Sequence, residues 1–127
     1  MTPKDRVRLA LAALSGFVGV AAGAFGAHGV GDPQVKLLLK TGAEYQMIHA
    51  LAVFACLAAQ RAGARTAGIA AWLFLAGGLL FAGSLYVLAL GRQGWAGPIT
   101  PLGGLMLLAG WAVLAASMLG ARDADRA

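Results

Sequence analysis

The chain has 127 residues, of which 60% are hydrophobic and 19 are glycine, while only 12% are charged. In soluble domains about a quarter of all residues are charged, so this composition excludes a disordered chain, a coiled coil and an ordinary water-soluble enzyme domain. Four long stretches lack Asp, Glu, Lys and Arg, and a bilayer core about 30 Å thick needs roughly 20 apolar residues per helix. The sequence therefore predicts an all-α integral membrane protein, with four transmembrane helices in an up-and-down bundle and a single domain over residues 1–127.

The formal net charge of +5 comes from basic residues at the ends of apolar runs, whereas a nucleic-acid site needs one basic patch. We therefore expect no nucleic-acid partner. With four spans both termini lie on one side of the membrane, and an excess of Lys and Arg marks the cytoplasmic side. The side of the termini holds seven of these residues against three, which predicts cytoplasmic termini: Lys4, Arg6, Arg8, Arg61, Arg65, Arg122 and Arg126, against Lys36, Lys40 and Arg92.

The first predicted span covers about residues 6–27. Its basic start and apolar stretch resemble a secretory signal, but the 19 apolar residues from Leu9 to Ala27 exceed a usual signal core. We therefore expect a retained helix. Small residues recur at every fourth position and form a flat ridge, which predicts close helix packing and a central place in the bundle. These residues are Ser15, Gly19, Gly23 and Ala27.

A second helix is predicted to begin at the Asp32-Pro33 pair, which combines an N-cap with a proline at the first helical position. If it continued to residue 60 it would extend roughly 42 Å, more than the hydrocarbon core. Either this helix tilts, or it breaks near Gly42. A break would leave an outer interfacial segment at 32–42 and a span at about 43–60.

The third and fourth spans are predicted at about 66–90 and 101–119. The fourth begins with Thr100-Pro101, a second cap-then-proline pattern. Trp95, in the outer loop between these spans, is expected to anchor the chain at the interface. Cys56 is the single cysteine and lies in an apolar run, so it is interpreted as an apolar filler, and neither an intramolecular disulfide nor a multi-cysteine metal site can form.

Polar side chains gather in the outer half of the predicted spans. At 100° per residue, Tyr45 and His49 share one stripe of the second helix, whereas Glu44 lies outside it, one turn after Lys40. Glu44 is therefore interpreted as an interfacial acid at headgroup level, with a proton-carrying intramembrane acid as the alternative. His49 lies near the bilayer centre, where an ionisable group must face the protein and find a partner, and Tyr45 is the nearest candidate.

Two roles for His49 remain open from the sequence, a structural hydrogen bond and a proton relay or ligand contact. Alternate helix ends meet at one face of an up-and-down bundle, which predicts a small outer pocket. Haem ligation by two histidines is compatible with such a bundle, but no attachment motif is present, and we predict neither a cofactor nor a metal. The predicted ligand-binding residues are His28, Tyr45, His49, Ser84 and Thr100.

Four ordered motifs give the chain a family resemblance. They are GAFGAHG at 23–29, YQMIHA at 45–50, LLFAGSLY at 79–86 and GPITPLGG at 97–104. With these motifs the sequence resembles the YgdD/YwdK-like family of small bacterial inner-membrane proteins, a domain-of-unknown-function family with a mitochondrial relative. The resemblance extends over nearly the whole chain. It implies a four-span protein of the bacterial plasma (inner) membrane, names no reaction and assigns no catalytic residue.

Covalent catalysis has no support in the sequence, because a nucleophile elbow, a catalytic triad, a phosphate loop and a dinucleotide fingerprint are all missing. We therefore expect a non-enzymatic accessory or scaffold protein, in contact with membrane lipids and with a second copy or another membrane protein. The alternative is proton-linked or small-molecule transport through the outer pocket around His49. An enzyme acting on lipid is a third interpretation.

Overall fold

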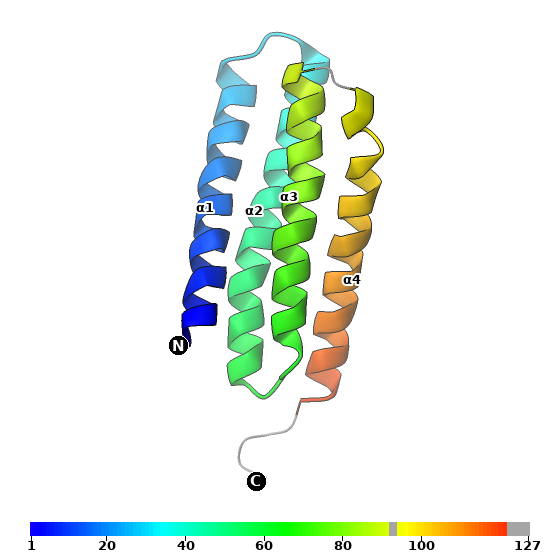
Figure 1. Ribbon diagram of the computed structural model, residues 1–127. Coiled ribbons are helices and arrows are strands. Elements are labelled where there is room, and N and C mark those ends of the chain that lie inside the picture. The colour runs from blue at the N-terminus through cyan, green and yellow to red at the C-terminus, as the bar shows by residue number, and fades with distance from the viewer. Residues whose placement is uncertain (92–93, 122–127) are drawn as a thin grey trace.

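The computed structural model describes residues 1–91 and 94–121, which form four long helices (Figure 1). These helices alternate in direction, so α1 begins and α4 ends at the same end of the molecule, and all four are long and apolar enough to cross a membrane. The all-α, four-span, up-and-down prediction is confirmed. Arg92, Arg122 and Arg126, which entered the charge count, lie outside the described residues. The helices are α1 (Pro3–His28), α2 (Pro33–Arg61), α3 (Ala67–Gly91) and α4 (Ile99–Leu119), with a 3-10 turn, η1 (Gly94–Ala96), before α4.

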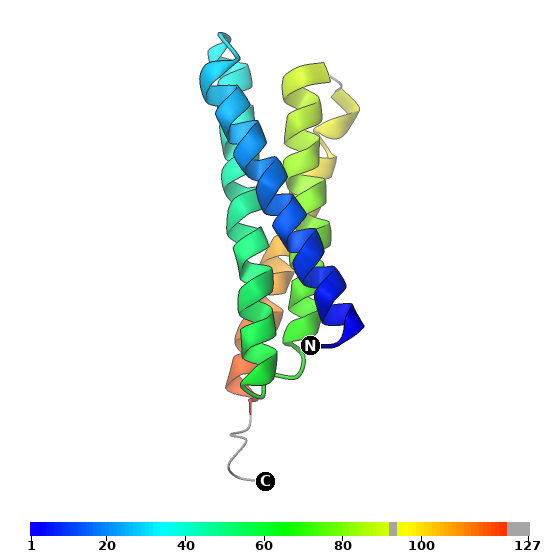
Figure 2. The same ribbon diagram turned by 90° about the vertical axis from the view of Figure 1, so that its left-hand side faces the viewer.

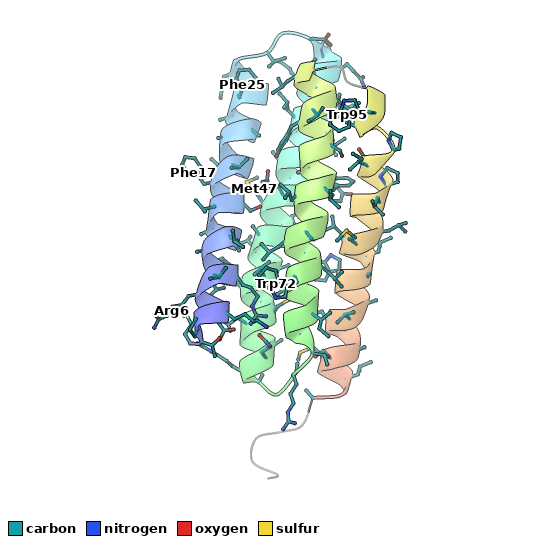
Figure 3. The ribbon with its side chains drawn as sticks, viewed as in Figure 1. Arg6, Phe17, Phe25, Met47, Trp72 and Trp95 are labelled. Atoms are coloured by element: carbon teal, nitrogen blue, oxygen red, sulfur yellow. The ribbon has the colours of Figure 1, made fainter. Side chains whose placement is uncertain are left out.

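The helices form a row in chain order. α2 packs between α1 and α3, α3 packs between α2 and α4, and within the described chain α1 and α4 do not touch. The expectation that the first helix is central is therefore wrong. Its Gly19, Gly23 and Gly26 lie on the side of α2, while its other sides carry large apolar residues such as Phe17, which is 74% exposed and points away from the row (Figure 3).

Side-chain caps set where the helices begin. α1 starts at Pro3, earlier than predicted, because Thr2 and Asp5 form a capping box in which each side chain accepts from the other's backbone N–H, at 3.1 and 3.0 Å. Asp32 caps α2 through the Gln34 N–H at 2.8 Å, as expected.

The predicted cap of α4 is wrong. This helix begins at Ile99 after Pro98, and no side chain caps it. Pro98 has a φ of −65° and is already in the right-handed helical region, so Thr100 falls inside the first turn. Its hydroxyl is engaged by α3 instead, as described below.

α2 is one continuous helix of 29 residues, so of the two alternatives the break near Gly42 does not occur. Residue 42 is buried against the ring of Tyr86 on α3, and a Cβ there would lie 2.6 Å from Cε1 of that ring. The glycine therefore serves the close approach of α3. The segment predicted as an interfacial piece at 32–42 is helical from Pro33 onward.

Alanine dominates the core between α2, α3 and α4. Cys56 is fully buried there, as its interpretation as an apolar filler requires, and Phe74 is the largest fully buried side chain. The short turn from α2 to α3 passes through Gly63, whose φ of 102° favours a residue without a Cβ. Small side chains let these helix backbones approach closely, which is the usual basis of packing in a membrane.

The predicted ridge of α1 meets α2 over most of its length. A Cβ at Gly19 would lie 2.7 Å from Cγ of Met47, a side chain between the two helices in Figure 3, and Gly23 is 3.5 Å from the Ala43 Cβ by the same construction. Ser15 is half-buried.

Ala27, the last member of the predicted ridge, is exposed. Gly26 takes its place against α2, where an added Cβ would lie 3.0 Å from the Leu39 Cβ. Four residues advance a helix by about 400°, so a strict every-fourth pattern rotates away by about 40° per step. The contact line compensates with a step of three residues, from Gly23 to Gly26.

Enlarging the ridge should separate α1 from α2. We expect Gly19→Leu and Gly23→Leu each to cost about 1–3 kcal/mol, because the added atoms must displace Met47 or press on Ala43. Leu11→Phe is the control, since Leu11 is 43% exposed. Thermal unfolding in detergent measures the effect, and equal midpoints for all three variants would contradict the packing.

Candidate functional site

His49 lies on the inner face of α2, where only 5% of its surface is exposed. Its Nδ1 is 2.6 Å from the backbone oxygen of Tyr45, and its Nε2 is 3.0 Å from the indole nitrogen of Trp111 on α4. An indole N–H can only donate, so Nε2 accepts, and the ring proton lies on Nδ1 and is donated to the Tyr45 carbonyl. His49 is thus a neutral ring with both nitrogens paired inside the protein.

Aromatic rings surround this histidine. The ring of Tyr45 stacks beside it at a centroid distance of 6.0 Å, and the rings of Phe74 and Trp111 lie at 5.5 and 5.8 Å. The inward orientation of His49 is confirmed. Tyr45 contributes its backbone carbonyl rather than its hydroxyl, and its side chain is 44% exposed.

Sequence reasoning missed Trp111 as the second partner. The signal that could have identified Trp111 is its depth in the membrane, which matches the depth of His49. At 1.5 Å per residue, Trp111 lies roughly 12 Å from the end of α4, and His49 lies roughly 16 Å from Gln60 near the same level.

Ser84 and Thr100, predicted as pocket residues, are brought together. Ser84 donates to the Phe81 carbonyl at 2.8 Å, so the Thr100 hydroxyl, 2.6 Å from the Ser84 hydroxyl, is the donor in that pair. A further pair that the sequence did not suggest joins α3 to α2, where the Tyr86 hydroxyl donates to the Gln46 amide oxygen at 2.6 Å.

The remaining predicted residues lie at the surface. His28 is the last residue of α1 and is exposed. Glu44 is exposed, 3.9 Å from the Lys40 ammonium, and its interpretation as an interfacial acid stays a prediction. The predicted pocket residues therefore form a Tyr45–His49 pair and a Ser84–Thr100 pair, while His28 lies exposed at the end of α1.

A second polar cluster, which sequence reasoning missed, lies at the other end of the molecule. Arg8 is 7% exposed and is the single charged residue among the buried residues of the described chain. It forms an ion pair with Asp5, and its Nη1 donates to the Gly68 carbonyl at 3.4 Å. Figure 2 shows why these residues meet, since α1 leans across α2 and brings its amino end beside the start of α3.

Gly68 is needed for this contact. A Cβ there would lie 2.6 Å from Arg8 Nη1 and 2.7 Å from the Gln60 amide nitrogen. The sequence signal was the spacing of Arg8, which precedes Ser15 of the ridge by one heptad and therefore shares its face. Arg8 had been interpreted as an orientation signal alone.

A hollow of about 370 Å³ opens beside this cluster, between the amino end of α1 and the carboxyl end of α2. Its polar walls come from Thr2, Asp5, Arg8, Gln60 and Arg61. A cavity of about 10 Å³, close to the space of one water, lies beyond and shares Arg8 and Gln60 with the hollow.

Comparisons with known proteins agree with this architecture. The model of the family described as "Protein of unknown function (DUF423)" matches residues 22–104, well over half of the chain. This chain belongs to the DUF423 family. Its relatives include the UPF0382 membrane protein YwdK of Bacillus subtilis, 39% identical over 86% of this chain and 93% of that protein. The UPF0382 inner membrane protein YgdD of Escherichia coli K12 is 41% identical over 87% of each chain.

A UPF0382 membrane protein of Haemophilus influenzae is 43% identical over 84% of this chain and 89% of its own. No solved structure gives a significant match. With relatives described as membrane proteins and four apolar helices, this DUF423 chain is a multi-pass membrane protein. The DUF423 match contains His49 and the Ser84–Thr100 pair, whereas Arg8 and Trp111 lie outside it.

Proposed function

We propose that this DUF423 protein is a non-enzymatic accessory or scaffold protein of the plasma membrane. The observation that carries the proposal is the use of its buried polar groups. His49 bonds to Trp111, Ser84 to Thr100, and Gln46 to Tyr86. Each bond joins two different helices, so these groups hold the row together and are engaged at the positions where a transported proton or ligand would need them.

The two outer helices supply surfaces for a scaffold. Only 17% of the most apolar part of α1 and 22% of that of α4 are buried, against 50% for α2. Large side chains such as Phe17 on α1 and Leu108 on α4 are exposed. These faces are the surfaces offered to lipid, to a second copy or to another membrane protein.

Photo-crosslinking in native membranes tests this proposal. A photoreactive amino acid is placed at Phe17, at Leu108, and at Leu79 on α3, which is 68% exposed in the middle of the row. A scaffold predicts protein adducts of defined mass at Phe17 or Leu108 and lipid adducts at Leu79. Lipid adducts at all three positions would contradict it.

We also propose that both termini lie in the cytoplasm, on the seven-to-three bias of basic residues. Gly31→Cys, in the loop between α1 and α2 where a Cβ meets nothing within 4 Å, should react with an impermeant maleimide in intact cells. Arg65→Cys, at the opposite end and exposed, should react only after permeabilisation. The native chain, whose cysteine Cys56 is buried, gives the background labelling. The reverse pattern of reactivity would show that the termini lie outside the cell.

Proton-linked transport remains the second candidate, because a titratable ring at mid-depth lies beside the half-exposed Tyr45. Proteoliposomes with an internal pH dye separate the two functions. The scaffold proposal expects the same proton leak for the native chain and for His49→Leu at equal protein density. A leak or substrate-driven pH change that His49→Leu abolishes would favour transport.

A further inference from the structure

We propose that the hollow beside Arg8 binds the phosphate group of a phosphate ester. It lies at the end of the molecule where α1 begins and α2 ends, away from the His49 cluster at mid-depth, and the proposal does not depend on the scaffold function. The shared chemistry could be supplied by a phospholipid headgroup or by a soluble phosphate ester, and the experiment below distinguishes these two sources.

Arg8 is the first reason for the proposal. A buried guanidinium in a membrane protein is costly unless it is paired, and such residues mark functional positions. Asp5 on α1 and the Gly68 carbonyl on α3 hold Arg8 from two helices. Together they engage two of its five N–H groups, which leaves donors on a side chain of fixed position.

The shape and charge of the hollow are the second reason. Its volume of about 370 Å³ falls at the lower end of the range for small-ligand sites. Among the side chains of its wall, Arg8 and Arg61 are positively charged and Asp5 is negatively charged, so one positive side-chain charge remains uncompensated. That charge matches a phosphodiester, which carries one negative charge. Arginine is suited to phosphate because its planar fork offers paired donors.

The position of the hollow is the third reason. It lies where α1 begins and α2 ends, at the boundary of two membrane spans and therefore at the level of lipid headgroups. Basic pockets between transmembrane helices at this level are a known form of headgroup site. The Gln60 amide, directed toward Gly68 beside Arg8, adds a neutral polar group to the same wall.

The experiment measures ligand-dependent thermal unfolding of the full chain in a neutral detergent. The probes are dioctanoyl phosphatidylglycerol, glycerol 3-phosphate as the soluble ester, and dioctanoylglycerol as a lipid without a phosphate group. We expect phosphatidylglycerol to raise the unfolding midpoint in a saturable manner and dioctanoylglycerol to have a much smaller effect.

Three variants locate the binding. Arg61→Gln should raise the apparent dissociation constant about tenfold, because Arg61 is an exposed residue whose loss removes charge from the wall without disturbing the core. Arg65→Gln is the matched control, four residues away, exposed and outside the wall, and should change the constant less than about twofold. Asp5→Asn should lower the constant severalfold, since the amide keeps an oxygen that can accept from Arg8 while the competing negative charge is removed.

Each outcome either supports or overturns the proposed phosphate site. Saturable stabilisation by phosphatidylglycerol alone supports the site with a lipid as its source, and stabilisation by glycerol 3-phosphate as well supports it with a soluble ester. Stabilisation by neither probe overturns the proposal, and so do equal effects of Arg61→Gln and Arg65→Gln. Weaker binding of phosphatidylglycerol by Asp5→Asn would also overturn the proposal. That result is expected if the Asp5–Arg8 pair is purely structural, because its loss would then lower the affinity instead of raising it.

Discussion

Gly103→Ala should separate α4 from α3. A Cβ at Gly103 would lie 2.5 Å from the backbone nitrogen and 2.9 Å from the Cα of Phe81, and 3.0 Å from the carbonyl oxygen of Gly77. These are backbone atoms, which cannot rotate away as a side chain can, so the helices themselves must move apart. We expect a cost of about 3 kcal/mol, at the upper end of what overpacking costs.

The neighbouring glycine gives a matched control. A Cβ at Gly104 would meet the ring of Phe81 at 3.8 Å, an ordinary van der Waals contact, and Gly104→Ala also improves helix propensity. Thermal unfolding in detergent should therefore show a large loss for Gly103→Ala and little change or a gain for Gly104→Ala. Similar midpoints for the two variants would mean that α3 and α4 do not pack at this register.

Removing the His49–Trp111 bond should be the second large effect. His49→Leu leaves the Trp111 N–H without its acceptor inside a membrane span, where no water replaces it, and this costs about 1–3 kcal/mol. Trp111→Phe removes the donor and some packing against Phe74, whose ring centroid is 4.8 Å away. The double variant should be less destabilised than the sum of the two single ones, with a coupling of about 1 kcal/mol, within the range found for interhelical bonds in membranes.

The same His49→Leu variant tests its role in the cell. Loss of stability with a matching fall in protein level indicates the structural role that the hydrogen bonds suggest. Normal stability and protein level together with a lost cellular phenotype would favour a functional histidine. If the destabilisation of the double variant equals the sum of the two single ones, the bond between His49 and Trp111 contributes nothing measurable to stability.

The fold was largely accessible from the sequence because the charge gaps define the spans without reference to tertiary structure. The Asp32-Pro33 start is local chemistry, and it was predicted correctly. The order of packing was not, since an α1 ridge of Gly19 and Gly23 shows that one close partner exists but cannot show how many. The reason for a glycine at position 42 is its contact with Tyr86, 44 positions later, and no local pattern reveals that contact.

The candidate sites were harder to predict from the sequence, because they too depend on contacts between residues far apart in the chain. A helical angle placed His49 correctly on the inner face, because periodicity belongs to a single helix. Its partner Trp111 and the pairing of Arg8 with Gly68 are contacts between helices far apart in sequence. Arg8 was also obscured by its neighbours, since Lys4 and Arg6 are exposed and the three together look like a topogenic cluster.

The row of helices has a consequence for how the chain is made. Each helix finds its main contacts with the one synthesised just before it, so α1 and α2 can pair as a hairpin before α3 has left the ribosome. α1 need not wait for α4, because the two never meet within the described chain, whereas His49 on α2 gains its Trp111 partner only when α4 arrives. Such local pairing gives a low contact order and favours fast assembly. Insertion can thus proceed by successive addition of helices, with α4 joining a three-helix unit whose other interfaces are already formed.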